Sequence, residues 1–221
     1  MAVRPSTVRG DQTREALIDA AIDIFGRDGF RAASTRSIAD SAKVNQALIG
    51  YHFGGKPGLY LAAFERIMRS VEQYLLPVAQ MLRPQLERGD PNVDQCLDYV
   101  HRLVEAFIAT FTSPESAAWA RLILREQQNP SEAFERLYER VMAPQLALLT
   151  GLIARIRGLD PRSTEARLLA QTVVGQALVF RSARATVLRH LELQELGVEE
   201  IATIHRVIRH NVTAMLIGGR S

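Results

Sequence analysis

The sequence predicts an all-α fold with a small N-terminal domain followed by a larger helical domain. Amphipathic helical patterns cover nearly all of the 221 residues, and no stretch shows the sustained alternation of a half-buried strand. Four capping side chains stand directly before a proline, which is typical of helix starts; they are Asp90, Ser113, Asn129 and Asp160. No internal repeat is visible, so a solenoid is not expected.

The first helix is expected over 11–28. Leu17, Ile24 and Phe25 belong to one apolar stripe, as in a helix that buries a single face. Gly29 comes directly after this segment and suits a left-handed residue at the C-terminal end of a helix.

Two short helices are expected next, over 35–42 and 46–53, with a tight turn between them. Thr35 can cap the first helix and Asn45 the second, because both side chains accept hydrogen bonds from free backbone N–H groups. Two short helices joined in this way form a helix-turn-helix, whose second helix enters the major groove of DNA. The sequence therefore predicts a three-helix DNA-binding domain over 1–56.

The rest of the chain, 57–221, is expected to form a helical ligand-binding and dimerisation domain. No low-complexity linker separates it from the first domain, so the chain continues directly into a long helix. The expected helices span 56–83, 92–112, 114–128, 131–157, 161–191 and 198–217.

The last two expected helices, 161–191 and 198–217, are the predicted homodimer interface. Two such helices from each subunit would form a four-helix bundle. The alternative is a hairpin buried inside one subunit. The proposed seam in the last helix has a heptad-like spacing with one polar position, and consists of Ile201, Ile204, Ile208, Asn211 and Met215.

Composition limits the class of protein. The net charge is +3, and no apolar run approaches the roughly 18–20 residues that cross a bilayer. The first ten residues lack the apolar block of a signal peptide, so we expect a cytoplasmic protein without a membrane partner. The single cysteine, Cys96, excludes an internal disulfide and a cysteine-rich zinc site.

Enzymatic motifs are missing from the sequence. It contains no glycine-rich phosphate loop, no G-x-S-x-G and no H-E-x-x-H. His101 and Glu105 lie four residues apart on one helix, but such a pair lacks a third metal ligand. We therefore predict no enzyme, no cofactor and no metal site.

Residues 13–60 resemble the N-terminal domain of TetR-type regulators. The resemblance rests on the end of the first helix, the I-A-x-x-A run, a tyrosine-histidine-phenylalanine cluster and the lysine after it. The matching residues are Phe25, Gly29, Thr35, Ile38, Ala39, Ala42, Val44, Tyr51, His52, Phe53, Lys56 and Leu59. Lys43 stands where the family usually has glycine, so a left-handed turn there would cost on the order of 1 kcal/mol.

Roles for the DNA-contacting side chains follow from their chemistry. Gln46 suits adenine, and small side chains at Ala47 and Gly50 allow close approach to the bases. The complete set, which includes residues suited to phosphates, is Thr35, Arg36, Lys43, Asn45, Gln46, Ala47, Gly50, Tyr51, His52 and Lys56. The alternative is that the aromatic cluster is core and that the charged residues are solvated.

Residues 119–144 and 171–189 resemble a CecR-type subgroup of the family. The resemblance is carried by Arg125, Glu126, Gln127, Pro130, Val141, Pro144, Gly175, Phe180 and Arg181. A pocket lined by apolar side chains with a few polar groups is expected in this domain. Its candidate residues are Tyr99, His101, Phe107, Phe111, Trp119, Arg125, Glu126 and Gln127. The alternative is plain core, with Arg125 and Glu126 as a structural pair or cap.

The resemblance implies a ligand-responsive transcriptional repressor. Such a protein binds double-stranded DNA at a palindromic operator as a dimer, and an unknown small-molecule inducer releases it. A DNA-binding activator or architectural protein without an inducer is the alternative. A metal-responsive regulator is a weaker alternative, because the five histidines are scattered along the chain and do not form a set of metal ligands.

Overall fold

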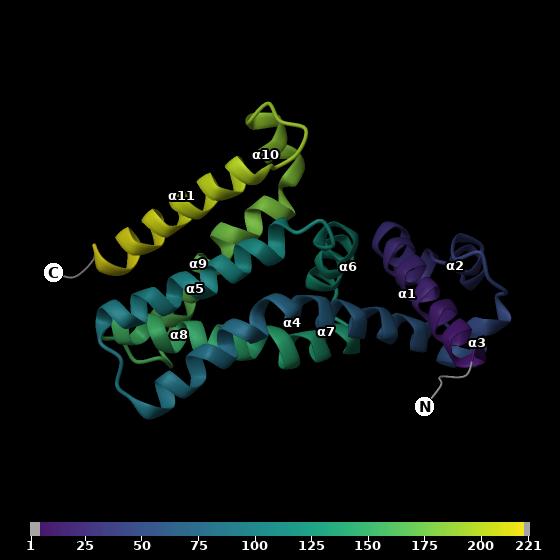
Figure 1. Cartoon of the computed structure of the whole chain (residues 1–221), viewed down its shortest axis with the longest axis horizontal. Helices are drawn as coiled ribbons and strands as arrows, with labels where there is room; N and C mark the ends of the chain where they lie inside the picture. Colours follow the sequence, from purple (N-terminus) through teal and green to yellow (C-terminus); the bar gives the residue numbers. More distant parts are fainter. Residues whose placement is uncertain (1–4, 219–221) are drawn as a thin grey trace. The chain divides into compact units, whose positions relative to one another are not determined.

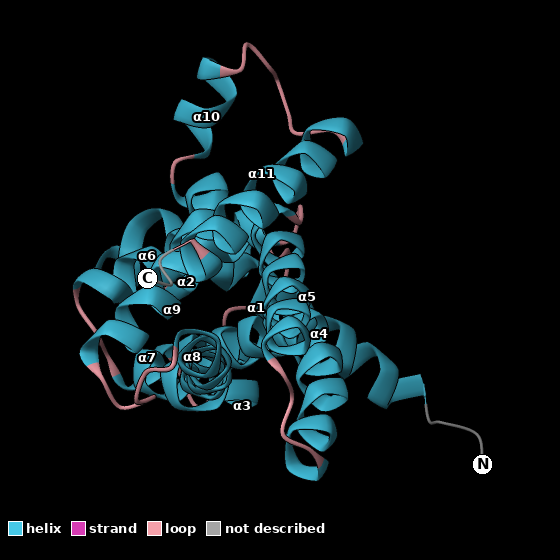
Figure 2. Cartoon of the chain, turned by 90° about the vertical axis from the view of Figure 1, so that its left-hand side faces the viewer, coloured by secondary structure: helices cyan, strands magenta, loops and turns pink. Residues whose placement is uncertain are grey.

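A computed structural model describes residues 5–218, and the prediction of an all-α fold is confirmed: this part of the chain contains helices and no strand (Figure 1). The helices are joined by short loops (Figure 2). They are α1 (Pro5–Ala32), α2 (Thr35–Ser41), α3 (Ala47–Phe53), α4 (Lys56–Arg88), α5 (Val93–Thr112), α6 (Ser116–Gln128), α7 (Glu132–Leu137), the π-helix η1 (Tyr138–Met142), α8 (Ala143–Arg157), α9 (Thr164–Ser182), α10 (Arg184–His190) and α11 (Val198–Ile217).

The chain forms two compact units. The first contains the residues up to Ser70 together with Ala117–Tyr138, and we call it the head. The second contains Val71–Ser116 and the residues from Glu139 onward, and we call it the body. The head therefore includes α6 and α7, which lie far along the sequence from the helix-turn-helix. The division into 1–56 and 57–221 remains a prediction.

The core of the head is built from every helix of the predicted DNA-binding domain. Phe25 of α1, Ile38 of α2 and Ile49 of α3 are buried. The ring of Phe25 meets Tyr60 of α4 edge-on, with 4.9 Å between centroids. These contacts are the apolar stripe that the sequence pattern predicts for α1.

Helix α1 breaks at Gly29. Its φ of 81° and ψ of 163° are open to glycine because it has no Cβ. The positive φ agrees with the predicted left-handed residue, although ψ is extended. A further turn continues to Ala32, and Ala33 N–H donates to the Gly29 carbonyl at 3.1 Å. The regular helix thus ends at residue 28, as predicted, because Gly29 has non-helical backbone angles. The helical hydrogen bonds, however, continue to Ala32.

The capping residues of three later helices differ from the prediction. The residue before a proline has extended backbone, which a capping residue also needs, so a proline alone does not fix where the helix begins. Ser113 Oγ accepts from Ser116 N–H at 3.2 Å, as expected for a cap. The other three caps lie beyond the proline, at Asn92 instead of Asp90, Ser131 instead of Asn129, and Ser163 instead of Asp160.

Two long predicted helices are interrupted. The segment predicted over 131–157 contains a π-helical turn at Tyr138–Met142 between α7 and α8. The segment predicted over 161–191 breaks at Ala183, whose φ of −111° and ψ of 27° separate α9 from α10. Among the described helices, none has the length and apolar character that crossing a membrane requires.

The core of the body lies where α5, α8, α9 and α11 pack together. Val100 and Leu103 of α5 are buried with Ile153 of α8 and Val173 of α9. Arg140 of η1 makes two hydrogen bonds of 2.7 Å to the Glu72 carboxylate of α4. The core of this helical bundle therefore consists mainly of aliphatic side chains.

Candidate nucleic-acid interface

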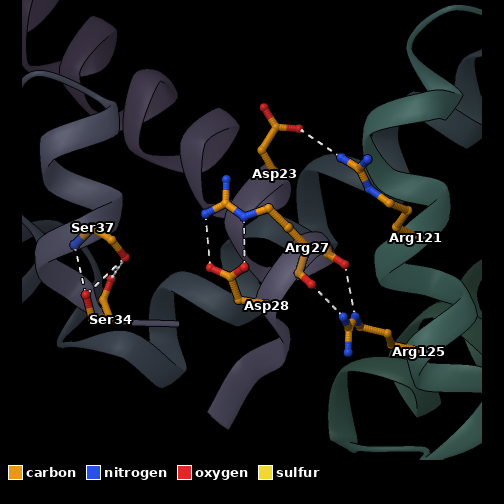
Figure 3. A network of polar contacts seen from close by, with 8 residues as sticks. Asp23, Arg27, Asp28, Ser34, Ser37, Arg121 and Arg125 are labelled. Carbon is orange, nitrogen blue, oxygen red and sulfur yellow. Dashed lines mark hydrogen bonds and ion pairs between the residues drawn. The ribbon is translucent and has the colours of Figure 1, made fainter. Parts of the chain in front are cut away.

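Ser34 caps helix α2. Its Oγ accepts a hydrogen bond of 2.9 Å from Ser37 N–H, and the two hydroxyl groups lie 3.0 Å apart (Figure 3). The prediction that Thr35 is the cap is wrong, because Thr35 is already the first helical residue. A serine stands four residues before the buried Ile38, and this spacing was the signal that could have located the cap.

The turn between α2 and α3 depends on Lys43 in a left-handed conformation. Its φ is 55°, as expected for a position where the family usually has glycine. Val44 N–H donates to the Ala39 carbonyl at 3.0 Å, which closes the turn. The backbone of the motif is thus kept, at a strain on the order of 1 kcal/mol.

Asn45 supplies the predicted hydrogen bond to the start of α3, although Gln46 is the residue directly before the helix. Asn45 Oδ1 accepts from Ala47 N–H at 2.8 Å. Ile49 is buried and Leu48 half-buried, so one face of α3 packs on the head. Gly54 ends the helix with a φ of 70°, its N–H bonded to the Gly50 carbonyl at 2.9 Å.

The opposite face of α3 is open to solvent. Tyr51 is 82% exposed, so the interpretation of this residue as core is wrong. Thr35, His52 and Lys56 are half-buried, and so is Phe53, whose ring lies 5.4 Å from the Arg14 guanidinium carbon. The exposed members of the predicted DNA-contacting set are Arg36, Lys43, Asn45, Gln46, Ala47, Gly50 and Tyr51.

Lys56 is engaged inside the head. Its Nζ donates to the Arg31 carbonyl at 3.3 Å and lies 4.8 Å from the centre of the Phe30 ring. The ammonium group therefore stabilises the turn after Gly29. A phosphate contact by Lys56 remains a prediction, and it would have to compete with this bond.

Arg125 ties α6 to the C-terminal end of α1. Its Nε donates to the Gly26 carbonyl at 2.9 Å and its Nη2 to the Arg27 carbonyl at 2.6 Å (Figure 3). Carbonyls at a helix end lack partners in their own helix and carry partial negative charge, so a guanidinium stabilises them. A Cβ at Gly26 would make an ordinary contact of 3.5 Å with Arg121 Cβ, so these hydrogen bonds do not depend on glycine at that position.

Glu126 is the buried hydrogen-bond acceptor beside Arg125, with a relative exposure of 6%. Oε1 accepts from the Tyr60 hydroxyl at 2.5 Å. Oε2 accepts from Ser131 N–H at 2.9 Å and Ser131 Oγ at 2.7 Å. Burial, together with the hydrogen bond to Glu126, raises the pKa of Tyr60 well above its usual value. Arg125 and Glu126 therefore hold helices of the head together. This is the structural role that the sequence analysis gave as the alternative to ligand binding.

The predicted ligand residues fall into two separate sets. Trp119, Arg125, Glu126 and Gln127 belong to the head, whereas Tyr99, His101, Phe107 and Phe111 belong to the body. In the body, an open pocket of about 470 Å³ lies between α4 and α5, and Tyr99 is the predicted residue that lines it. The other lining residues, which are not among the eight candidates, are Met81, Gln85, Asp94, Gln95, Asp98 and Arg102. A ligand role for the eight residues remains a prediction.

His101 is 4% exposed, and its Nε2 lies 3.0 Å from Thr213 Oγ1 of α11. Within the part of the chain that the structure describes, its Nδ1 has no hydrogen-bond partner. Burial, aided by the charge of Arg209, lowers the pKa of His101 to about 4. The ring is therefore neutral at neutral pH and joins α5 to α11.

The low pKa of His101 predicts a loss of stability in mild acid. The unfolded chain, with an imidazole pKa near 6.5, binds more protons than the folded chain between that pH and pH 4. The stabilisation is present above about pH 6.5 and is lost as the pH falls. Between about pH 7.5 and about pH 5, wild type should lose about 2 kcal/mol more than His101→Gln in urea unfolding. Equal losses of unfolding free energy in wild type and His101→Gln would contradict the low pKa of His101.

The predicted dimer seam is partly wrong. Ile204 and Ile208 of α11 are buried within the subunit, together with Val212 and Leu216, because this face packs on α5 and α8. Ile201 and Met215 are half-buried, and Asn211 is exposed. The exposed large apolar side chains of α9 and α11 are Leu168, Val179, Val198 and Val207.

Comparison with known proteins identifies the family. The family model for the C-terminal domain of the HTH-type transcriptional dual regulator CecR matches residues 97–219, more than half of the chain. The family model for bacterial regulatory proteins of the tetR family matches residues 17–63. This chain belongs to the TetR family, in its CecR-like branch. Both resemblances seen in the sequence are thereby confirmed.

Relatives of this TetR-family chain are transcription regulators, in agreement with the prediction that it is not an enzyme. It is 29% identical over 212 residues to the HTH-type transcriptional dual regulator CecR of Shigella flexneri, covering 96% of this chain and 95% of the relative. It is 32% identical over 113 residues to the HTH-type nicotine-responsive transcriptional repressor HdnoR of Paenarthrobacter nicotinovorans, covering 51% of each.

Solved structures share the fold of this TetR-family chain. AibR in complex with isovaleryl coenzyme A and operator DNA has a TM-score of 0.64 at 17% identity, covering 90% of this chain and 97% of AibR. A TetR-like transcriptional regulator from Rhodococcus sp. has a TM-score of 0.62 at 20% identity, covering 94% and 97%.

Proposed function

We propose that this TetR-family regulator is a ligand-responsive transcriptional repressor that binds a palindromic operator as a dimer and is released by a small-molecule inducer. The observation that carries the proposal is the make-up of the head. It joins an exposed recognition helix, α3, to α6 and α7 in one compact unit. Helix α3, which would bind DNA, therefore belongs to the same unit as α6 and α7 from the middle of the chain. A displacement of α6 or α7 can thus be passed on to α3.

The link supports release by a ligand. Arg125 holds α6 to α1, and Glu126 holds it to Tyr60 of α4 and to Ser131 at the start of α7. A ligand that displaces α6 therefore displaces α1 as well, and with it the frame on which α3 rests. The ligand needs to favour the displaced state by only a few kcal/mol.

The dimer is proposed to form through α9 and α11. Leu168, Val179 and Val207 are exposed apolar side chains on these helices. Gly175 lies between Leu168 and Val179 on α9. A Cβ at Gly175 would have nothing within 4 Å, so another helix can approach closely. A two-fold dimer would place two recognition helices about 34 Å apart, which matches a palindromic operator.

The chemistry of the inducer is proposed to be that of a small organic molecule. Among the related proteins, HdnoR is named as nicotine-responsive and AibR was solved with isovaleryl coenzyme A. The second candidate function, activation, is favoured by the name of CecR as a dual regulator. In either role the protein would act in the cytoplasm, where the chromosome lies.

Binding to the DNA upstream of the chain's own gene tests the proposal. Wild type should bind this duplex far more tightly than a scrambled duplex of equal length in a salt titration. Gln46→Ala should cost about 1–3 kcal/mol at one base pair, because Gln46 is exposed at the start of α3 and suits a base edge. Equal binding of wild type to both duplexes would contradict the proposed function. Equal weakening of Gln46→Ala on every duplex would contradict only its base-reading role.

A further inference from the structure

A side-chain hydrogen bond joins the two helices of the helix-turn-helix. Gln46 Nε2, at the start of α3, donates to Thr35 Oγ1, the first residue of α2, at 2.8 Å. The residues are eleven positions apart in the sequence, and Gln46 is exposed. The long amide side chain is thus fixed on the surface that α3 presents outward.

Both ends of this hydrogen bond stand on a fixed backbone. Ser34 caps the helix that begins at Thr35, through its bond to Ser37 N–H. Asn45 accepts from Ala47 N–H at 2.8 Å, and Ile49 N–H donates to the Gln46 carbonyl at 3.0 Å. Because the amide is already oriented, less side-chain entropy is lost when it meets a ligand.

We propose that Thr35 is a positioning residue that orients the Gln46 amide to read adenine and to disfavour guanine at one operator base pair. The inference rests on the proposed function, since it requires sequence-specific DNA binding. An amide has one carbonyl oxygen and two N–H donors. Thr35 Oγ1 takes one N–H, which leaves Oε1 and the second N–H of Gln46.

The remaining pair of groups matches one base. Adenine offers an N7 acceptor and an N6 donor in the major groove, which pair with one amide N–H and Oε1. Guanine offers two acceptors, N7 and O6, and would need both N–H donors of the amide. Without Thr35 Oγ1 the amide can turn and give both donors to guanine. The hydroxyl proton of Thr35 stays available for a phosphate oxygen.

The test begins with selection of preferred sites from a random-sequence duplex library by the full-length wild type. The base pair that Gln46→Ala no longer discriminates is assigned to Gln46. Duplexes with adenine or guanine at that position are then compared by fluorescence anisotropy, for wild type, Thr35→Val and Thr35→Ser. Circular dichroism melting checks that each variant is folded, and Thr35→Ala replaces Thr35→Val if the valine variant is not.

Adenine should be the preferred base at the assigned position. Thr35→Val should reduce the adenine-to-guanine affinity ratio by about tenfold, whereas Thr35→Ser, which keeps the hydroxyl, should retain most of it. In the Gln46→Ala background, Thr35→Val should leave the ratio unchanged.

Three results would overturn the inference while leaving the proposed function intact. One is another preferred base at the assigned position, and another is the absence of any position that depends on Gln46. The third is an equal weakening of both duplexes by Thr35→Val, which would make Thr35 a phosphate contact only. A wild type that selects no sequence at all would instead remove the proposed function, and this inference with it.

Discussion

Replacement of Glu126 by alanine should lower the free energy of unfolding by about 4 kcal/mol. The carboxylate is buried and accepts from the Tyr60 hydroxyl, Ser131 N–H and Ser131 Oγ. Hydrogen bonds to a charged group contribute about 1.5–3 kcal/mol each, and the hydroxyl of the buried Tyr60 would lose its acceptor. Denaturant unfolding followed by circular dichroism measures the loss. A lower salt dependence of operator binding would show that the variant makes fewer phosphate contacts.

Two variants serve as controls for Glu126→Ala. Glu126→Gln keeps the shape but replaces one acceptor oxygen with a donor, so about half of the loss is expected. Glu132→Ala removes a carboxylate that makes an exposed 2.6 Å ion pair with Arg136, and should cost less than about 0.5 kcal/mol. If Glu126→Ala is as stable as wild type but blind to inducer, Glu126 is a ligand contact instead.

Replacement of Arg181 by methionine should lower the free energy of unfolding by about 3 kcal/mol. Arg181 Nε donates to the Phe111 carbonyl at 2.8 Å, and Nη2 donates to the Ser113 carbonyl at 2.7 Å. These carbonyls lie at the C-terminal end of α5, where the helix offers no internal partner. Methionine fills much of the space but leaves both carbonyls with Ser116 Oγ as their remaining side-chain donor, and thermal or urea unfolding reports the difference.

The charge and the geometry of Arg181 can be separated. Arg181→Lys keeps a cation but lacks the planar fork that reaches two carbonyls, so it should recover only part of the stability. Arg189→Met removes an exposed arginine of α10 and should change stability by less than about 0.5 kcal/mol. Burial lowers the pKa of Arg181, so the guanidinium depends on these two acceptors for solvation. A loss below 1 kcal/mol for Arg181→Met would show that water donates to the two carbonyls in place of the guanidinium.

Features that depend on local pattern could be predicted from the sequence. The helices arise from the spacing of apolar residues, and Leu17 and Phe25 are buried as that spacing requires. The hydrogen bond to Asn45 follows from the preference of asparagine for helix starts. The left-handed turn at Lys43 follows from the family resemblance, because lysine itself disfavours that conformation. The family follows from short motifs of the same kind.

Features that depend on partners far along the chain could not be predicted. The stripe of Ile204 and Ile208 fits a dimer seam and an internal core equally well, and contacts with α5 and α8 make it core. The polar character of Arg125 and Glu126 suggests a ligand, yet their partners, Gly26 and Tyr60, lie on other helices of the head. No periodicity reports such pairings, since they are set by tertiary packing.

The inclusion of α6 and α7 in the head has a consequence for protein engineering. A hybrid regulator that took only the first 56 residues from this protein would leave the Gly26 and Arg27 carbonyls without Arg125. It would also pack the rings of Phe25 and Phe30, which contact Tyr60 in this protein, against a foreign residue. A graft intended to transfer operator specificity should therefore carry Ala117–Tyr138 along with the N-terminal segment up to Ser70. Its three crossover points would fall after Ser70 within α4, beside Ser116 and within the π-helical turn.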